Sequence, residues 1–140
     1  MVYYYLDHTS DVYIHVISNK LEGIFEDAAK ATFEIMIDTS SVEEKEIIDL
    51  EVEGKDLEQL LYKWIDCILL IFDSKSFALN RAKVEEIKKN ENYHIKAKLY
   101  GEEYDPKKHD HRTGVKAMTY SLMRIFKSND HWEAYFVVDI

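Results

Sequence analysis

The chain has 140 residues, a formal net charge of −9 at pH 7, 46% hydrophobic residues and one cysteine. The size and apolar content predict a single globular domain over residues 1–140, whereas the acidity argues against tight, independent binding to nucleic acid, which depends on Lys and Arg at phosphates. Cys67 alone excludes an intrachain disulfide and a cysteine-rich zinc site. With no apolar run of 18 residues and no signal-peptide pattern, we expect a cytoplasmic protein without membrane partners.

Two segments repeat apolar residues at the spacing of an amphipathic helix. The first covers residues 21–36, and Asn19 with Glu22 resembles a capping box at its start. The second covers residues 57–72, where Asp56 followed by Gln59 supplies the start signal. Its apolar face is wider, so we expect the second helix to be the more buried one.

The remaining patterned segments indicate strands. Residues 48–53 and 93–100 alternate apolar and polar side chains, and a strand over 77–87 forms a hairpin with the latter. Residues 115–126 fit a helix and a strand equally well, while the aromatic and β-branched segment 132–140 predicts a buried strand. Together these elements predict an α+β fold, a two-layer sandwich with both helices packed on one face of a mixed or antiparallel sheet.

Acidic residues near both ends of the chain form a candidate cation site. Asp7 and Asp11 lie near the start, and Asp139 precedes Ile140 at the end. If the two segments occupy neighbouring strands, their carboxylate and main-chain oxygens suit a hard cation such as Ca²⁺ or Mg²⁺. The residues alone favour a simpler alternative, in which Asp7 or Asp11 caps a turn and Asp139 is solvated.

The polar segment 101–111 is a second candidate region. His109 and His111 suggest transition-metal ligands, but no third ligand is evident in this solvated loop. The sequence also lacks the glycine-rich nucleotide-binding motifs and the Gly-x-Ser-x-Gly elbow, so it contains no recognisable enzyme motif.

Four motifs in order resemble the archease family over the whole chain. They are Asp7-His8-Thr9-Ser10-Asp11, the block from Gly101-Glu102 to Lys108-His109, Val115-Lys116-Ala117-Met118-Thr119-Tyr120, and the final Asp139-Ile140. Ser10 stands where the family has alanine, and the loop from Asp105 to Gly114 is long. The charged positions are kept, so the resemblance implies the archease-like fold, in which the ambiguous segment 115–126 is a strand.

The resemblance also implies a function. Members of this family activate the GTP-dependent tRNA-splicing RNA ligase by promoting guanylylation of its active-site histidine and supporting multiple turnovers, and they are not enzymes themselves. Contact with RNA is then expected only through the ligase. The implied metal site consists of Asp11, Asp139 and Ile140, with Ca²⁺ expected ahead of Mg²⁺ or Mn²⁺. The residues implied in partner binding or activation are Asp7, His8, Lys108, His109 and Lys116.

Two other classes of function remain open at this point. In a small metal-dependent phosphoester hydrolase, Asp11 and Asp139 would hold the ion and His8 would act as general base. In a non-catalytic chaperone or scaffold, the two aspartates would be structural. A hydrolase should turn over a phosphoester without any partner, and this separates it from the other two classes.

Overall fold

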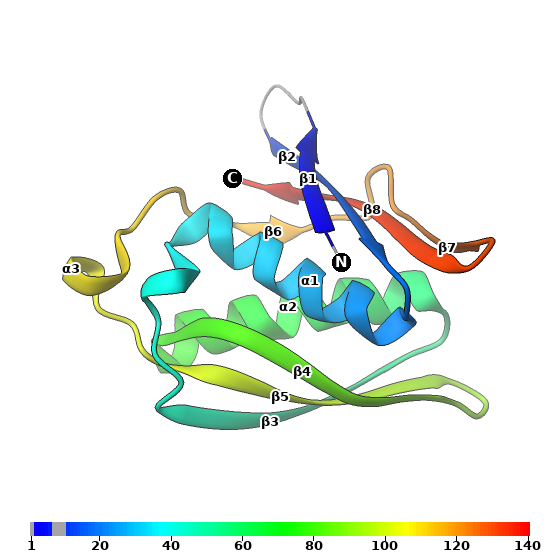
Figure 1. Cartoon of the computed structure of the whole chain (residues 1–140), viewed down its shortest axis with the longest axis horizontal. Coiled ribbons are helices and arrows are strands. Elements are labelled where there is room, and N and C mark those ends of the chain that lie inside the picture. Colours follow the sequence, from blue (N-terminus) through cyan, green and yellow to red (C-terminus); the bar gives the residue numbers. More distant parts are fainter. Residues whose placement is uncertain (1, 7–10) are drawn as a thin grey trace.

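The computed structural model describes residues 2–6 and 11–140. In chain order, the elements are β1 Val2–Leu6, β2 Asp11–Ser18, α1 Leu21–Met36, the 3₁₀ turn η1 Thr39–Ser41, β3 Glu46–Gly54, α2 Leu57–Lys75, β4 Phe77–Lys89, β5 Tyr93–Glu103, α3 Pro106–His109, β6 Ala117–Met118, β7 Arg124–Ser128 and β8 His131–Asp139 (Figure 1). None of the helices among the described residues is long and apolar enough to cross a membrane.

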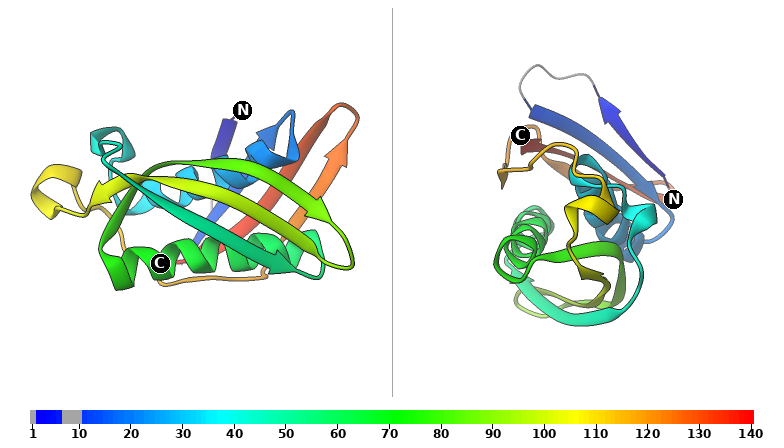
Figure 2. Two further views of the ribbon diagram at one scale, coloured as in Figure 1. Left: turned by 90° about the horizontal axis from the view of Figure 1, so that it is seen from below. Right: turned by 90° about the vertical axis from the view of Figure 1, so that its left-hand side faces the viewer.

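The strands form two antiparallel sheets with α1 and α2 between them. The first sheet has the order β1-β2-β8-β6, with β7 also paired to β8, and the second has the order β3-β5-β4 (Figures 1 and 2). The predicted α+β class and antiparallel pairing are confirmed. Each helix, however, contacts strands of both sheets, so the helices are covered on two sides instead of lying on one face of a single sheet.

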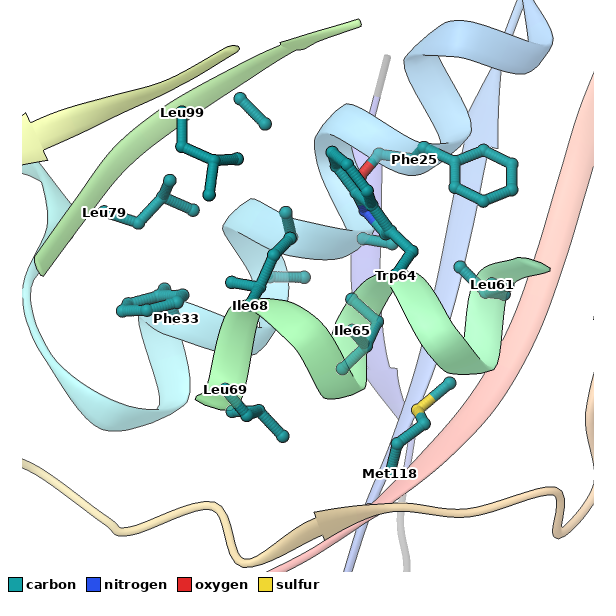
Figure 3. Close-up of a cluster of buried hydrophobic side chains, with 14 of the residues drawn as sticks. Phe25, Phe33, Leu61, Trp64, Ile65, Ile68, Leu69, Leu79, Leu99 and Met118 are labelled. Atoms are coloured by element: carbon teal, nitrogen blue, oxygen red, sulfur yellow. The ribbon is translucent and has the colours of Figure 1, made fainter. Parts of the chain in front are cut away.

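The core lies where the two helices meet the sheets. Trp64 of α2 is fully buried, and its indole N–H donates to the carbonyl oxygen of Phe25 on α1 at 2.9 Å. The rings of Phe25 and Trp64 meet edge to face with centroids 6.1 Å apart, and Figure 3 shows Trp64 directed toward α1. This one side chain therefore joins the helices by apolar burial and also satisfies its own polar group.

The relative burial of the helices differs from the prediction. Helix α1 buries residues around most of its circumference, including Ala31 and Phe33, because its contacts with the two sheets are more extensive than those of α2. Helix α2 leaves Lys63, Asp66 and Leu70 exposed on its outer side. The expectation that the second helix is the more buried was therefore wrong, since the width of an apolar face does not reveal how much of the helix its neighbours cover.

The two helices begin differently. At α2 the Asp56 carboxylate accepts a hydrogen bond from the Gln59 N–H at 2.8 Å, so the predicted start signal is confirmed. Helix α1 has Lys20 at its N-cap position, and no side chain caps it there. The predicted capping box of Asn19 and Glu22 does not form, because the helix begins one residue later than that box requires.

The hairpin of β4 and β5 carries the second candidate region at its end. Gly101 on β5 packs so closely on β4 that a Cβ atom there would lie 1.9 Å from the carbonyl oxygen of Ala78. Only glycine allows this approach, which brings the next residue, Glu102, into a buried position.

Segment 115–126 contains no helix but parts of two strands with a turn between them, whereas the family resemblance implied a single strand. Strand β6 covers only two residues, and β7 begins at Arg124, with a turn between them in which Leu122 has a positive φ of 55°. Both the N–H and the hydroxyl of Thr119 donate to the carbonyl oxygen of Val137. The early end of β6 and the turn after it explain why periodicity did not decide between a helix and a strand for this segment.

Candidate functional site

Asp11 and Asp139 meet at one end of the first sheet. They are directly opposite each other in the pairing of β2 with β8, although they are 128 positions apart in the sequence. On its other side, Asp139 is opposite Ala117 of β6, and its carbonyl oxygen accepts a hydrogen bond from the Lys116 N–H at 2.8 Å. Opposite residues of an antiparallel pair share a face of the sheet, so the two carboxylates form an aspartate pair on one face.

The aspartate pair lies at the surface. Asp139, Ile140 and Lys116 are exposed, and Asp11 is half-buried. Like charges directly opposite each other on a sheet are destabilising, so the arrangement favours a cation nearby. The hydrogen bond from the Lys116 N–H to the Asp139 carbonyl oxygen holds the backbone of one cationic residue beside the pair.

The donor set of this end suits a hard divalent cation. Asp11 and Asp139 supply carboxylate oxygens and Ile140 supplies main-chain oxygen, which is the chemistry that Ca²⁺ and Mg²⁺ prefer. Within residues 2–6 and 11–140, no group of three or more His, Cys, Asp or Glu side chains is placed to hold a metal ion. Asp7 and His8, two further predicted residues, lie outside the described residues.

A second polar cluster surrounds Glu102 at the end of β5. Its carboxylate accepts hydrogen bonds from the Glu43 N–H at 2.8 Å, from His109 Nε2 at 3.0 Å and from Lys108 Nζ at 2.9 Å. Burial alone raises the pKa of Glu102, but these donors outweigh it and lower the pKa to about 2. Glu102 is only 5% exposed, so the cluster holds a charged carboxylate inside the protein.

His109 is a structural partner of Glu102. The ring is fully buried, and its Nδ1 accepts a hydrogen bond from the Asp105 N–H at 2.9 Å. A nitrogen that accepts cannot carry the proton, so the network assigns a neutral ring whose Nε2–H donates to Glu102. Both ring nitrogens are therefore used, which leaves none for a zinc ion shared with His111. Direct contact of His109 with a partner would also require this segment to move.

The chain after His109 connects the Glu102 cluster to the aspartate pair. The carbonyl oxygen of His109 accepts from the Asp38 N–H, and the N–H groups of Arg112 and Thr113 donate to the carbonyl oxygens of Met36 and Ile35. The bonds from Arg112 and Thr113 satisfy carbonyl groups at the C-terminal end of α1, which a helix leaves without intrahelical partners. From there the chain runs on to Lys116 and β6 (Figure 1).

Lys108, unlike His109, remains partly accessible. Its ammonium group lies 2.9 Å from Glu102 and 3.1 Å from Glu43, and the hydrogen bond to Glu102, followed by that to Glu43, raises its pKa. It lines a cavity of about 650 Å³ together with Lys45, Glu102 and Tyr104. Lys108 can therefore contribute positive charge at the surface while it shields a buried carboxylate.

The sequence analysis did not single out Glu102 or Arg112. Glu102 belongs to one of the motifs that carry the family resemblance, and the signal was its position directly after a glycine at the end of an alternating strand. Arg112 lies in the long loop, and its guanidinium group donates to the carbonyl and carboxylate oxygens of Glu34. No local sequence pattern predicts that contact, because it joins residues 78 positions apart.

Comparison with known proteins gives a consistent result. The model of the "Archease protein family (MTH1598/TM1083)" matches residues 3–140. Proteins named "Protein archease" from Sulfolobus acidocaldarius and Pyrobaculum neutrophilum are each 45% identical to this chain, over 136 and 140 residues, and the alignments cover 97% and 99% of it and 96% and 95% of the relatives.

Solved structures agree in fold. The solution structure of Methanobacterium thermoautotrophicum protein 1598 has a TM-score of 0.84 at 33% identity and covers 99% of this chain and 98% of its own. The crystal structure of "an archease, possible chaperone" from Thermotoga maritima has a TM-score of 0.62 at 20% identity, with 96% and 94% covered, and supports the fold alone. The family model and the relatives together show that this chain belongs to the archease family.

Proposed function

We propose that this protein is a non-enzymatic activator of the GTP-dependent tRNA-splicing RNA ligase. The observation that carries the proposal is the register of β2 and β8, which sets Asp11 opposite Asp139 at an exposed end of a chain of the archease family. In this role the protein promotes guanylylation of the ligase's active-site histidine and supports repeated turnover. The ligase supplies every group that makes or breaks a bond.

The proposal includes a divalent cation, with Ca²⁺ preferred. Asp11, Asp139 and the main-chain oxygen of Ile140 would hold it, and the oxygen-only donor set supports this choice. When bound, such a cation offers open coordination positions to a carboxylate or phosphate of the partner. Two protein carboxylates and one main-chain oxygen leave room for such groups in the six to eight positions that Ca²⁺ fills.

The residues around the aspartate pair have separate roles in the proposal. Exposed Lys116 meets a carboxylate or phosphate of the ligase, and its backbone bond to Asp139 keeps it beside the pair. Lys108 adds a second cationic contact beside the 650 Å³ cavity. Glu102 and His109 act indirectly, by holding the segment that leads from α3 to Lys116.

The charge of the protein is consistent with a protein partner. At a formal net charge of −9, the chain repels RNA phosphates and is attracted to a basic surface of a protein that binds RNA. Such complementarity mainly accelerates association and fixes orientation. RNA is therefore contacted through the ligase only.

Multiple-turnover RNA joining by the cognate ligase tests the proposal. With GTP and divalent metal, the intact chain should increase the number of turnovers, whereas Asp139→Asn should lose most of the stimulation because it removes one charge from the pair without changing side-chain size. Asp66→Asn is the matched control, since Asp66 is an exposed residue of α2 and the aspartate pair lies on β2 and β8. Equal stimulation by all three proteins would remove Asp139 from the mechanism, and no stimulation by the intact chain would refute the activator function.

A second candidate, a chaperone, has one observation in its favour: the Thermotoga maritima archease of the same fold is described as a possible chaperone. A chaperone would suppress aggregation of an unfolded client without GTP, and Asp139→Asn would leave that suppression intact.

A reaction containing the protein and a phosphoester but no ligase tests the hydrolase alternative. Turnover in that reaction would contradict the activator proposal.

A further inference from the structure

Strand β1 forms an open edge of the first sheet. It pairs with β2 on one side, and among the described residues no strand pairs with its other side. Figure 2 shows β1 at the outer margin of the molecule. An edge strand of this kind presents a row of backbone N–H and C=O groups to any strand that can lie beside it.

The edges of the second sheet are protected. On β4, the Val84 N–H donates to the Glu26 carboxylate at 2.8 Å and the Asn80 carbonyl oxygen accepts from Lys30 Nζ at 2.6 Å, so side chains of α1 occupy backbone groups of this edge. Strand β4 also has two register shifts against β5. The β3 edge carries four acidic residues, namely Glu46, Asp49, Glu51 and Glu53. Bulges and charged side chains are the usual means by which proteins prevent edge-to-edge pairing.

Within the part of the chain that the structure describes, β1 shows none of these protections. Its sequence, Val-Tyr-Tyr-Tyr-Leu, contains no charged residue and no proline, and its pairing with β2 runs over all five residues without a register shift. Four of its side chains are exposed, at 45% for Val2, 50% for Tyr4, 46% for Tyr5 and 37% for Leu6. This edge is therefore apolar, regular and accessible, in contrast to the edges of the second sheet.

We propose that β1 pairs antiparallel with β1 of a second copy of this chain across a twofold axis at Tyr4. The sequence of β1 reads aliphatic, aromatic, aromatic, aromatic, aliphatic in both directions. Antiparallel pairing centred on Tyr4 places Val2 opposite Leu6, Tyr3 opposite Tyr5 and Tyr4 opposite itself. A twofold interface requires such a self-complementary patch, and the order of side chains in β1 satisfies that requirement.

The surface beside β1 supports this geometry. The ring of Tyr4 lies 5.8 Å from that of His15 on β2, and the His15 ring stacks on Tyr135 of β8 at 4.0 Å. A row of rings therefore crosses the outer face of the first sheet and ends at Tyr4, next to the axis. In the dimer two such rows meet at the two Tyr4 rings, and aromatic pairs across strands stabilise a sheet.

The expected association is weak and depends on salt. One strand pair buries less surface than a standard stable interface, so the dimer should form only at high protein concentration. Each copy also carries a formal net charge of −9, and the repulsion between two copies weakens as salt screens it. Higher ionic strength should therefore strengthen dimerisation, which is opposite to the behaviour of an interface held by ion pairs.

Sedimentation velocity over a concentration series tests the proposal. The intact chain should shift from monomer to dimer, and Tyr4→Lys should weaken association by about tenfold or more, because it sets two like charges against each other at the axis. Ile47→Lys is the control: Ile47 is a 57% exposed strand residue on β3, and its replacement should leave the dimer unchanged. An intact chain that is still monomeric at about 1 mM would overturn the proposal.

A disulfide experiment tests the register even if Tyr4→Lys alters folding. Paired strands bring opposite Cα atoms to about 4.5–5.5 Å, within the range that a disulfide spans. With Cys67 replaced by alanine, Tyr4→Cys should therefore form a covalent dimer under mild oxidation, and Ile47→Cys should not. Equal cross-linking of both variants, or of neither, would overturn the pairing. Association through another surface would appear as a Tyr4→Lys variant that still dimerises.

Discussion

At the scale of single residues, Glu102 is the most informative position. It combines near-complete burial with a charge, which is costly unless donors surround the carboxylate. Here a backbone N–H, a histidine and a lysine do so, and the pKa falls to about 2 although burial opposes that shift. A carboxylate held this way links the protonation of one side chain to the stability of the whole fold.

Glu102→Gln should therefore change how stability depends on pH. The native pKa of about 2 is below the ordinary 4.5, so below pH 4.5 the unfolded chain binds more protons than the native one. The contribution of Glu102 is complete above pH 4.5 and is lost as the pH falls toward 2. Urea unfolding at pH 5 and pH 3 should show a smaller loss of stability for Glu102→Gln than for the parent.

Glu103→Gln is the matched control for this prediction. Glu103 is the exposed neighbour of Glu102 on β5, and replacing it should leave the loss of stability between pH 5 and pH 3 as in the parent. The same loss in the parent and in Glu102→Gln would mean that Glu102 does not govern this part of the acid response.

At the scale of elements, the start of α2 shows which local signals are reliable. Asp56→Ala removes the carboxylate that accepts from the Gln59 N–H and should lower the free energy of unfolding by about 1 kcal/mol. Asn19→Ala, at the position that the sequence suggested for the cap of α1, should cost little because no side chain caps that helix. Urea unfolding of both variants gives the comparison, and equal losses would contradict this assignment of the caps.

Local sequence patterns predicted the elements in which one pattern of apolar residues runs through the whole element. The two helices, the β4–β5 hairpin and β3 follow from the spacing of their apolar residues, and the terminal strand follows from its aromatic and β-branched residues. The division into two sheets could not be predicted this way, because a pattern shows that a face is buried but not what covers it. Segment 115–126 was ambiguous because β6 ends after two residues and the chain turns at Leu122.

The candidate site was predictable only in part, for a similar reason. Its residue types were visible near both ends of the chain, and the family resemblance named Asp11, Asp139 and Lys116. The contacts that position them depend on tertiary structure: Asp139 meets Asp11 through strand pairing, and His109 is buried against Glu102. The sequence predicted a partner-binding, exposed His109, whereas the structure buries its ring. Sequence alone could not separate these two roles, because a histidine at this position is compatible with both.

At the scale of the whole molecule, the aspartate pair joins the two ends of the chain. Two like charges opposite each other oppose the pairing of β2 with β8, which holds the first sheet together. Asp139→Asn removes this repulsion, so without divalent cations it should melt at or slightly above the temperature of the parent. A cation bound to the pair would reverse that order, because it stabilises only the native state of the parent.

Thermal unfolding with added Ca²⁺ tests this reversal on the isolated chain. At a free Ca²⁺ concentration 100 times its dissociation constant, the parent should gain about 2.7 kcal/mol, which corresponds to a rise of several degrees in Tm. Asp139→Asn should gain much less, Asp66→Asn should behave as the parent, and a chelator should cancel the rise. Equal shifts in all three proteins would exclude the aspartate pair as the cation site. Because no ligase is present, such a result would refute cation binding at the aspartate pair without testing the activator function. That function is tested by the RNA-joining experiment alone.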